Sequence, residues 1–149
     1  MVRALHPAEG HFSFGQHYAV LNLDWMSLLI DGIKDTAVGQ EFIKNCSRWN
    51  NAVHQKDPRP LTIFTSLFFS NPAQTELAKD SPFARLIQAY GNFEKGSPGV
   101  KIDSTFVVDE QDVVLQKTRW YAGAGNSLEQ ILRAQNIDTV IIVCIHPSD

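Results

Sequence analysis

Residues 112–143 constrain the fold of this chain more than any other stretch of it. Their pattern predicts a short β-branched strand at 113–117, a loop that contains glycines, a helix, and a second strand at 139–143. The second strand is a continuous apolar run, which is typical of a strand covered on both faces. A strand, a helix and a further strand in this order form a crossover unit, and such units join parallel strands. The sequence therefore predicts a parallel sheet.

The helix of this unit has identifiable start and stop residues. Asn126 is a suitable N-cap, and Glu129 follows three positions later, as in a capping box. Asn136 is a suitable left-handed stop after the last turn. Three apolar residues share one helical face: Leu128, Ile131 and Leu132. We expect this face to pack on the sheet.

Length and composition are those of one ordinary globular domain. The chain has 149 residues, which is near the usual size of a domain, and its 44% hydrophobic and 19% charged residues are typical of soluble proteins. We divide it into a flexible lead-in at 1–17, without periodicity, and one α/β domain at 18–149. The lead-in region contains scattered histidines with no ligand spacing, so we predict surface residues and no metal site there: His6, His11 and His17.

Charge and cysteine usage exclude several classes of protein. The net charge of −3, with no basic block, gives no electrostatic case for nucleic acid. The N-terminal residues do not have the pattern of a signal peptide, and no apolar run is long enough to span a membrane. The two cysteines, Cys46 and Cys144, do not form a disulfide framework. We predict reduced thiols in a cytoplasmic protein that has no cofactor motif.

Residues 18–24 are predicted as the first strand, and their mostly apolar faces suit a central parallel strand. Asp24 stands at the carboxyl end of this strand, where open α/β sheets bind their ligands. Two interpretations remain open from position alone. Asp24 is either a general base or a carboxylate that caps the following turn.

The middle of the chain predicts two helices and two strands. A helix capped by Asp35 or Thr36 runs to about Gln55, and its apolar stripe comprises Val38, Phe42, Ile43, Cys46, Trp49 and Val53. Cys46 on that stripe is predicted to be a buried, unreactive thiol. A buried strand follows at 61–69, then a helix that starts at Ser81-Pro82 and stops at Gly91, then a short strand at 106–108. Core packing is favoured over a pocket wall for four aromatic residues: Phe68, Phe69, Phe83 and Tyr90.

The loop of the crossover unit resembles a motif of the isochorismatase-like cysteine hydrolases. That family carries a pattern like K-x-R-Y-S-A-F-x-G-T-x-L at the end of a strand. Five residues match it in register: Lys117, Arg119, Ala122, Gly125 and Leu128. Within this pattern, Tyr121, Gly123 and Asn126 depart from the family's usual residues. Outside it, Met26 stands two residues after Asp24, where the family usually has a glutamine. The run LRAQNIDTVIIV resembles the family's next helix and strand, and residues 18–24 resemble its first strand.

The resemblance implies a three-layer Rossmann-like parallel sheet with helices on both faces and a catalytic triad of Asp, Lys and Cys. Asp24 would be the base that takes the thiol proton, and Lys117 the cation that orients the groups and favours the thiolate. Because both residues end parallel strands, they can meet at the same sheet edge. Taken alone, the two could also be an ion pair that only closes the top of the sheet.

The third member of the triad has no counterpart at the expected place. In the family, the strand at 139–143 leads to a glycine and then to a T-x-x-C turn. Here Cys144 takes the place of the glycine, and residues 145–149 replace the turn. Cys144 would lie on the strand, with no following helix to lower its pKa. His146, Ser148 and Asp149 are too close together on one tail to converge as a triad.

The resemblance therefore implies a divergent or C-terminally truncated family member, whose sheet lacks its last strands and exposes an apolar edge. The expected function is hydrolysis of a small-molecule amide, imide or vinyl ether, impaired or absent for want of the nucleophilic cysteine. The alternative is a non-catalytic remnant that binds a paralogue or another partner through this edge. We expect self-association in either case. A nucleotide-binding Rossmann-like domain is a weaker third possibility, because no G-x-G-x-x-G follows the first strand.

Overall fold

The structure is a computed structural model, and it describes residues 15–145. Four strands form one parallel sheet in the order β3-β2-β1-β4. The elements, in chain order, are β1 (Tyr18–Leu23), α1 (Ser27–Ile33), α2 (Ala37–His54), β2 (Leu61–Leu67), α3 (Pro82–Gln88), the 3-10 turn η1 (Pro98–Val100), β3 (Val113–Lys117), α4 (Leu128–Ala134) and β4 (Thr139–Cys144). The parallel sheet predicted from the crossover unit is confirmed.

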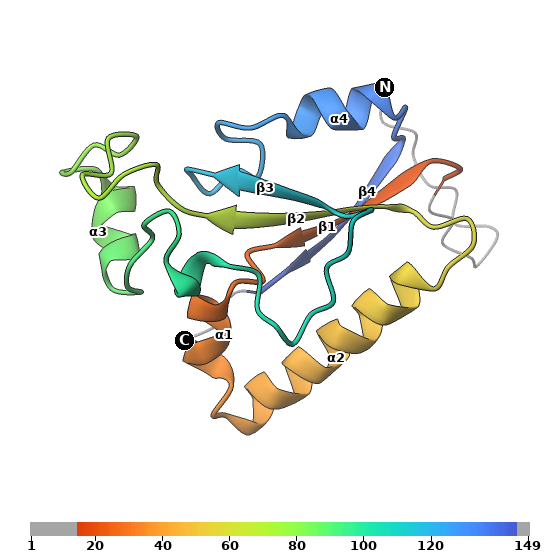
Figure 1. The fold of residues 1–149 in the computed structure, drawn as a ribbon, viewed down its shortest axis with the longest axis horizontal. Helices are drawn as coiled ribbons and strands as arrows, with labels where there is room; N and C mark the ends of the chain where they lie inside the picture. The colour runs from red at the N-terminus through yellow and green to blue at the C-terminus, as the bar shows by residue number, and fades with distance from the viewer. Residues whose placement is uncertain (1–14, 146–149) are drawn as a thin grey trace, which may run out of the picture.

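Helices cover both faces of the sheet, so the three-layer prediction is also confirmed (Figure 1). On one face, Leu21 and Ile63 pack beneath α4, whose contacting residues are Leu128, Ile131 and Leu132. On the other face, Phe64 packs with Cys46 of α2 and Ile30 of α1. Successive strand residues point to opposite faces, and β1 and β2 therefore supply both cores.

Helix α2 begins where its cap residue predicts. The side chain of Thr36 accepts a hydrogen bond from Gly39 N at 3.0 Å. The predicted apolar stripe is buried at Cys46 and Val53 but fails at Val38, which is 80% exposed because the first turn projects beyond the edge of the core. Asn50, which the predicted stripe did not include, is buried on this helix, and its amide donates to Val107 O at 2.7 Å.

Two short elements differ from the sequence predictions. Helix α1 was not predicted, since its seven residues include Gly32 and no side chain caps its start. The short strand predicted at 106–108 is wrong. Phe106 is instead buried against Trp25, with ring centroids 4.5 Å apart, and Val107 offers its carbonyl to α2 rather than to a neighbouring strand.

Helix α4 begins one residue later than its predicted cap. The N-cap position is Ser127, whose side chain makes no capping bond. The carboxamide oxygen of Asn126 accepts from Leu128 N, and its amide donates to Gln116 O and Ala122 O, at 2.7 Å each. Asn126 therefore secures the preceding loop to β3 as well as the helix start. The left-handed stop at Asn136 is confirmed, with φ of 50°.

Strand β4 lies at one edge of the described sheet. Ile142 is 60% exposed, so the prediction that this strand is covered on both faces is wrong within the described residues. The alternative expectation of an apolar sheet edge describes β4 better. An apolar run alone does not distinguish a strand inside a sheet from one at its margin.

Parts of the sequence predictions fall outside the described residues: 1–14, which include His6 and His11, and 146–149, which include the tail residues. Of the lead-in, residues 15–17 are described, and the backbone N–H groups of Gln16 and His17 donate to the carboxylate of Asp138. Within residues 15–145, no helix has the length and apolar character needed to cross a membrane.

Candidate active site

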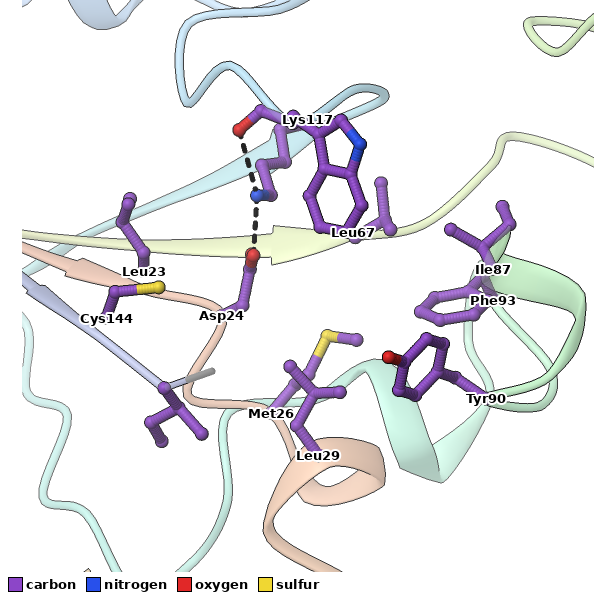
Figure 2. A pocket seen from close by; sticks show the side chains of 12 residues that line it. Leu23, Asp24, Met26, Leu29, Leu67, Ile87, Tyr90, Phe93, Lys117 and Cys144 are labelled. Carbon is purple, nitrogen blue, oxygen red and sulfur yellow. Dashed lines mark hydrogen bonds and ion pairs between the residues drawn. The ribbon is translucent and has the colours of Figure 1, made fainter. Parts of the chain in front are cut away.

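Asp24 immediately follows β1 and has an unusual backbone. Its φ is 59°, in the left-handed region that Asp and Asn adopt more readily than other non-glycine residues. Its N–H donates to Thr65 O on β2 at 3.1 Å, which holds the turn in place. A residue fixed in this region costs conformational energy, and such residues cluster at functional sites. This conformation directs the Asp24 carboxylate across the carboxyl end of the sheet (Figure 2).

Lys117 is the last residue of β3 and reaches the same place from two strands away. Its ammonium nitrogen lies 2.5 Å from Oδ2 of Asp24 and donates to Trp120 O at 3.3 Å (Figure 2). The lysine side chain is only 2% exposed. Thr65, on the intervening strand β2, donates its hydroxyl to Oδ1 of Asp24 at 3.2 Å. Polar side chains from three adjacent strands thus form one cluster near the carboxyl end of the sheet.

Burial is the strongest influence on Asp24 and raises the pKa of its carboxyl above the usual value. The positive charge of Lys117 and the hydrogen bonds from Lys117 and Thr65 act in the opposite direction. A carboxyl group with a raised pKa is a better proton acceptor when ionised, as a general base requires. The ion pair with Lys117 thus favours the charged form of this carboxyl, and burial favours its neutral form.

A cavity of about 110 Å³ opens beside the ion pair (Figure 2). Its polar lining consists mainly of Asp24, Lys117 and Cys144. The remaining lining side chains are apolar or aromatic: Leu23, Met26, Leu29, Leu67, Ile87, Tyr90, Phe93, Trp120 and Ile145. The site can therefore hold a small molecule with a polar reacting group at one end and an apolar body.

Cys144 lies at the end of β4, where the strand register sets it opposite Leu23. Figure 2 shows its sulfur on the Asp24 side of the cavity. Partial burial and the negative charge of Asp24 raise the pKa of this thiol, and Lys117 opposes them only in part. The surroundings therefore disfavour the nucleophilic thiolate. Cys46, in α2, is buried as predicted, and burial raises its pKa to about 11.

Comparison with known proteins shows to which family the chain belongs. The sequence model of the isochorismatase domain matches residues 18–146. The chain belongs to the isochorismatase family. No curated protein matches it significantly in sequence.

Solved structures of isochorismatase-like proteins share the fold at low identity. N-carbamoylsarcosine amidase from Thermoplasma acidophilum is 20% identical, with a TM-score of 0.66 over 87% of this chain and 68% of that one. The pyrazinamidase of Pyrococcus horikoshii is 18% identical, with a TM-score of 0.61 over 88% and 72%. An isochorismatase family protein from Desulfovibrio vulgaris is 16% identical, with a TM-score of 0.67 over 87% and 67%. The chain thus spans about two thirds of their length.

The structure brings together both residues that the family resemblance singled out, Asp24 and Lys117. Of the four aromatic residues considered as pocket walls, only Tyr90 lines the cavity. Sequence reasoning missed Thr65 and Trp120. Thr65 could have been found, because it lies near the carboxyl end of the strand adjacent to β1. Trp120 gives no comparable signal, since its role follows from the path of the loop after β3.

A second polar cluster lies at the opposite end of the sheet. Ligand atoms of His54, Asp109 and Asp112 fall within 4.8 Å of one another, which is compact enough for a metal ion. However, the guanidinium of Arg59 contacts Asp109 at 2.7 Å and Asp112 at 2.7 Å. A cation already balances these carboxylates, and we interpret the cluster as an ion-pair network that joins α2 to the start of β3.

Proposed function

We propose that this chain carries the hydrolase site of an isochorismatase-like protein that acts on a small-molecule amide, imide or vinyl ether. The observation that supports this most directly is the buried contact of 2.5 Å between Asp24 and Lys117, both of which line the cavity. An ion pair serving only to close the sheet would need no cavity beside it. Here the pair forms the polar end of an otherwise apolar pocket.

In this proposal Asp24 accepts the proton of the attacking group, and Lys117 stabilises charge that develops on the substrate oxygen. An ammonium group has three N–H donors. Lys117 directs one to Asp24 and one to Trp120 O, and a third remains for the substrate. Thr65 holds the Asp24 carboxylate in a fixed orientation.

We further propose that residues 1–149 by themselves turn over substrate slowly or not at all. The sequence has two cysteines. Cys46 is buried in α2 away from the cavity, and the pKa of Cys144 is raised. Neither thiol is activated for attack on a carbonyl carbon.

The test is ammonia release from a panel of primary amides by the purified 149-residue chain. We expect release at most slightly above that of the Asp24→Asn variant, which keeps the left-handed backbone and removes the base. Robust release that survives in Asp24→Asn would exclude Asp24 as the base. Robust release that is lost in Asp24→Asn would support the site and refute the proposed impairment.

A second candidate function, binding to another chain, is favoured by the β4 edge. Its six residues, TVIIVC, contain no charge, proline or glycine, and Ile142 is 60% exposed. We propose that a second copy of the chain pairs here, because identical edge strands can pair antiparallel about a two-fold axis. Sedimentation velocity should detect a dimer that Ile142→Lys dissociates. A monomeric wild type, or an assembly indifferent to Ile142→Lys, would refute this arrangement.

A further inference from the structure

The cavity beside the ion pair is small and its body is apolar. It measures about 110 Å³, and aromatic and aliphatic side chains such as Ile87, Phe93 and Trp120 line it. Drug-sized ligands occupy pockets of roughly 300 Å³ or more. An apolar cavity of about 150 Å³ is known to hold benzene. The space beside Asp24 and Lys117 therefore suits a group about one ring in size.

The charges at the cavity cancel each other. Asp24 and Lys117 are its only charged lining residues among those described, and they are paired at 2.5 Å. Arg119, the next cation along the chain, points elsewhere and donates to Glu76 O at 2.5 Å and Thr118 O at 2.6 Å. A substrate carboxylate would lose its water in this cavity without gaining an unpaired cation, which is costly.

Hydrogen-bonding groups are equally scarce in the body of the cavity. Tyr90 carries the main side-chain hydroxyl of the lining, and it is 40% exposed. The indole N–H of Trp120 is the other side-chain donor in this part of the lining. Ring nitrogens of a bound heterocycle would exchange several water contacts for at most these two partly exposed donors. The third N–H of Lys117 is available at the polar end, where a substrate carbonyl oxygen can accept it.

Trp120 contributes to both the polar and the apolar part of the cavity. Its carbonyl accepts from Lys117, and its indole lines the apolar part while packing edge-on against Phe83, with ring centroids 5.3 Å apart. The side chain is 56% exposed, so a bound ligand can bury much of the indole. A large aromatic surface covered on binding contributes strongly to affinity.

We propose that this cavity takes an uncharged, hydrocarbon acyl group about one ring in size, and that Trp120 is the residue that selects it. The inference rests on the proposed hydrolase site and specifies its substrate class. It differs from what the fold alone implies, because a shared fold says nothing of the substrate.

Equilibrium binding to the full 149-residue chain, measured by ligand-observed NMR, tests this proposal without requiring turnover. The probes are benzamide, benzoate and pyrazinamide, which share size and shape but differ in charge or in ring nitrogens. We expect benzamide to bind at least about tenfold more tightly than benzoate, and also more tightly than pyrazinamide. Benzoate or pyrazinamide binding as well as benzamide, or no detectable benzamide binding, would overturn the proposal.

The chain offers a matched pair of variants for Trp120. Tyr121 is the adjacent aromatic residue, is also 56% exposed, and does not line the cavity. Trp120→Ala should weaken benzamide binding at least about tenfold, whereas Tyr121→Ala should leave it within about twofold. Equal effects of the two variants would show that Trp120 has no selective role.

Ammonia release, measured with the same amides, separates failure of this inference from failure of the proposed function. Benzamide binding without ammonia release supports the inference and agrees with the slow turnover proposed for the isolated chain. Release of ammonia from a charged or hydrophilic amide, with benzamide unbound, overturns the inference and leaves the hydrolase function standing.

Discussion

The ammonium group of Lys117 lies 2.5 Å from the carboxylate of Asp24, although β2 separates the two strands that carry them. The lysine spans this gap because its side chain extends over the end of β2, where Thr65 contacts the same carboxylate. Both charged groups are largely withdrawn from water, with side-chain exposures of 2% for Lys117 and 12% for Asp24. The contact is therefore unlike a surface salt bridge, whose removal costs little.

Removal of either partner should destabilise the fold, and by unequal amounts. Asp24→Asn leaves the more deeply buried ammonium without its counter-charge, and we expect a loss of about 3 kcal/mol in the free energy of unfolding. Lys117→Met leaves a carboxylate with more access to water and should cost less. The measurement is urea unfolding of both variants and of the double variant.

The double variant is the control for this prediction. Because each single change leaves one uncompensated charge, the double variant should lose less stability than the two single losses added together. Additive losses would contradict a direct interaction between Asp24 and Lys117.

Cys46 should make the stability of the protein fall at high pH. Burial raises the pKa of its thiol from 9.0 to about 11, so the folded chain retains a proton that the unfolded chain releases. The contribution is fully present below about pH 9 and is lost as the pH rises through about 11. Compared with Cys46→Ala, the wild type should lose about 2–3 kcal/mol more across this window.

Urea unfolding at several pH values between 8 and 11 checks this expectation about Cys46. Tyrosine and lysine groups titrate in the same range, but both proteins contain them, so the difference between the two curves isolates the thiol. Parallel curves would mean that Cys46 is accessible to solvent in the folded state.

Two helical glycines near the α1–α2 junction should respond in opposite ways to alanine. A Cβ on Gly39 would lie 2.0 Å from Ile33 O and 2.8 Å from the Thr36 hydroxyl that caps α2. We expect Gly39→Ala to lower the free energy of unfolding by about 1–3 kcal/mol, because the backbone at Ile33 would have to move. A Cβ on Gly32 meets nothing within 4 Å, so Gly32→Ala should stabilise by about 0.5–1 kcal/mol.

Thermal or urea unfolding of the two glycine variants is sufficient to test this pair. The matched design removes the general effect of alanine in a helix, since both positions are helical. If Gly39→Ala proved neutral, the close approach of Gly39 to the turn before α2 would be wrong.

Patterns with a local cause could be predicted from the sequence, and features set by distant packing could not. Thr36, Ser81 and Asn136 act where their side chains or backbone preferences indicate, because caps and stops depend on neighbouring residues. The position of β4 at an edge depends on strand order, which an apolar run does not encode. Asp24 and Lys117 could be paired because parallel strand ends meet.

Reaction of the two thiols with iodoacetamide should report the electrostatics of the cavity directly. Cys144 is exposed and Cys46 is buried, so the native protein should be alkylated at Cys144 alone and the denatured protein at both. Because its pKa is raised, Cys144 should react more slowly at pH 7 than a free cysteine does.

Two charged neighbours of Cys144 act in opposite directions on the pKa of its thiol. The carboxylate of Asp24 raises the pKa of the thiol and the ammonium of Lys117 lowers it. Asp24→Asn should therefore speed alkylation at pH 7, and Lys117→Met should slow it, while Tyr121→Ala, outside the cavity, should leave the rate unchanged. Mass spectrometry of the alkylated peptide gives the rates. Equal rates in all three variants would show that the thiol of Cys144 does not share a cavity with the ion pair.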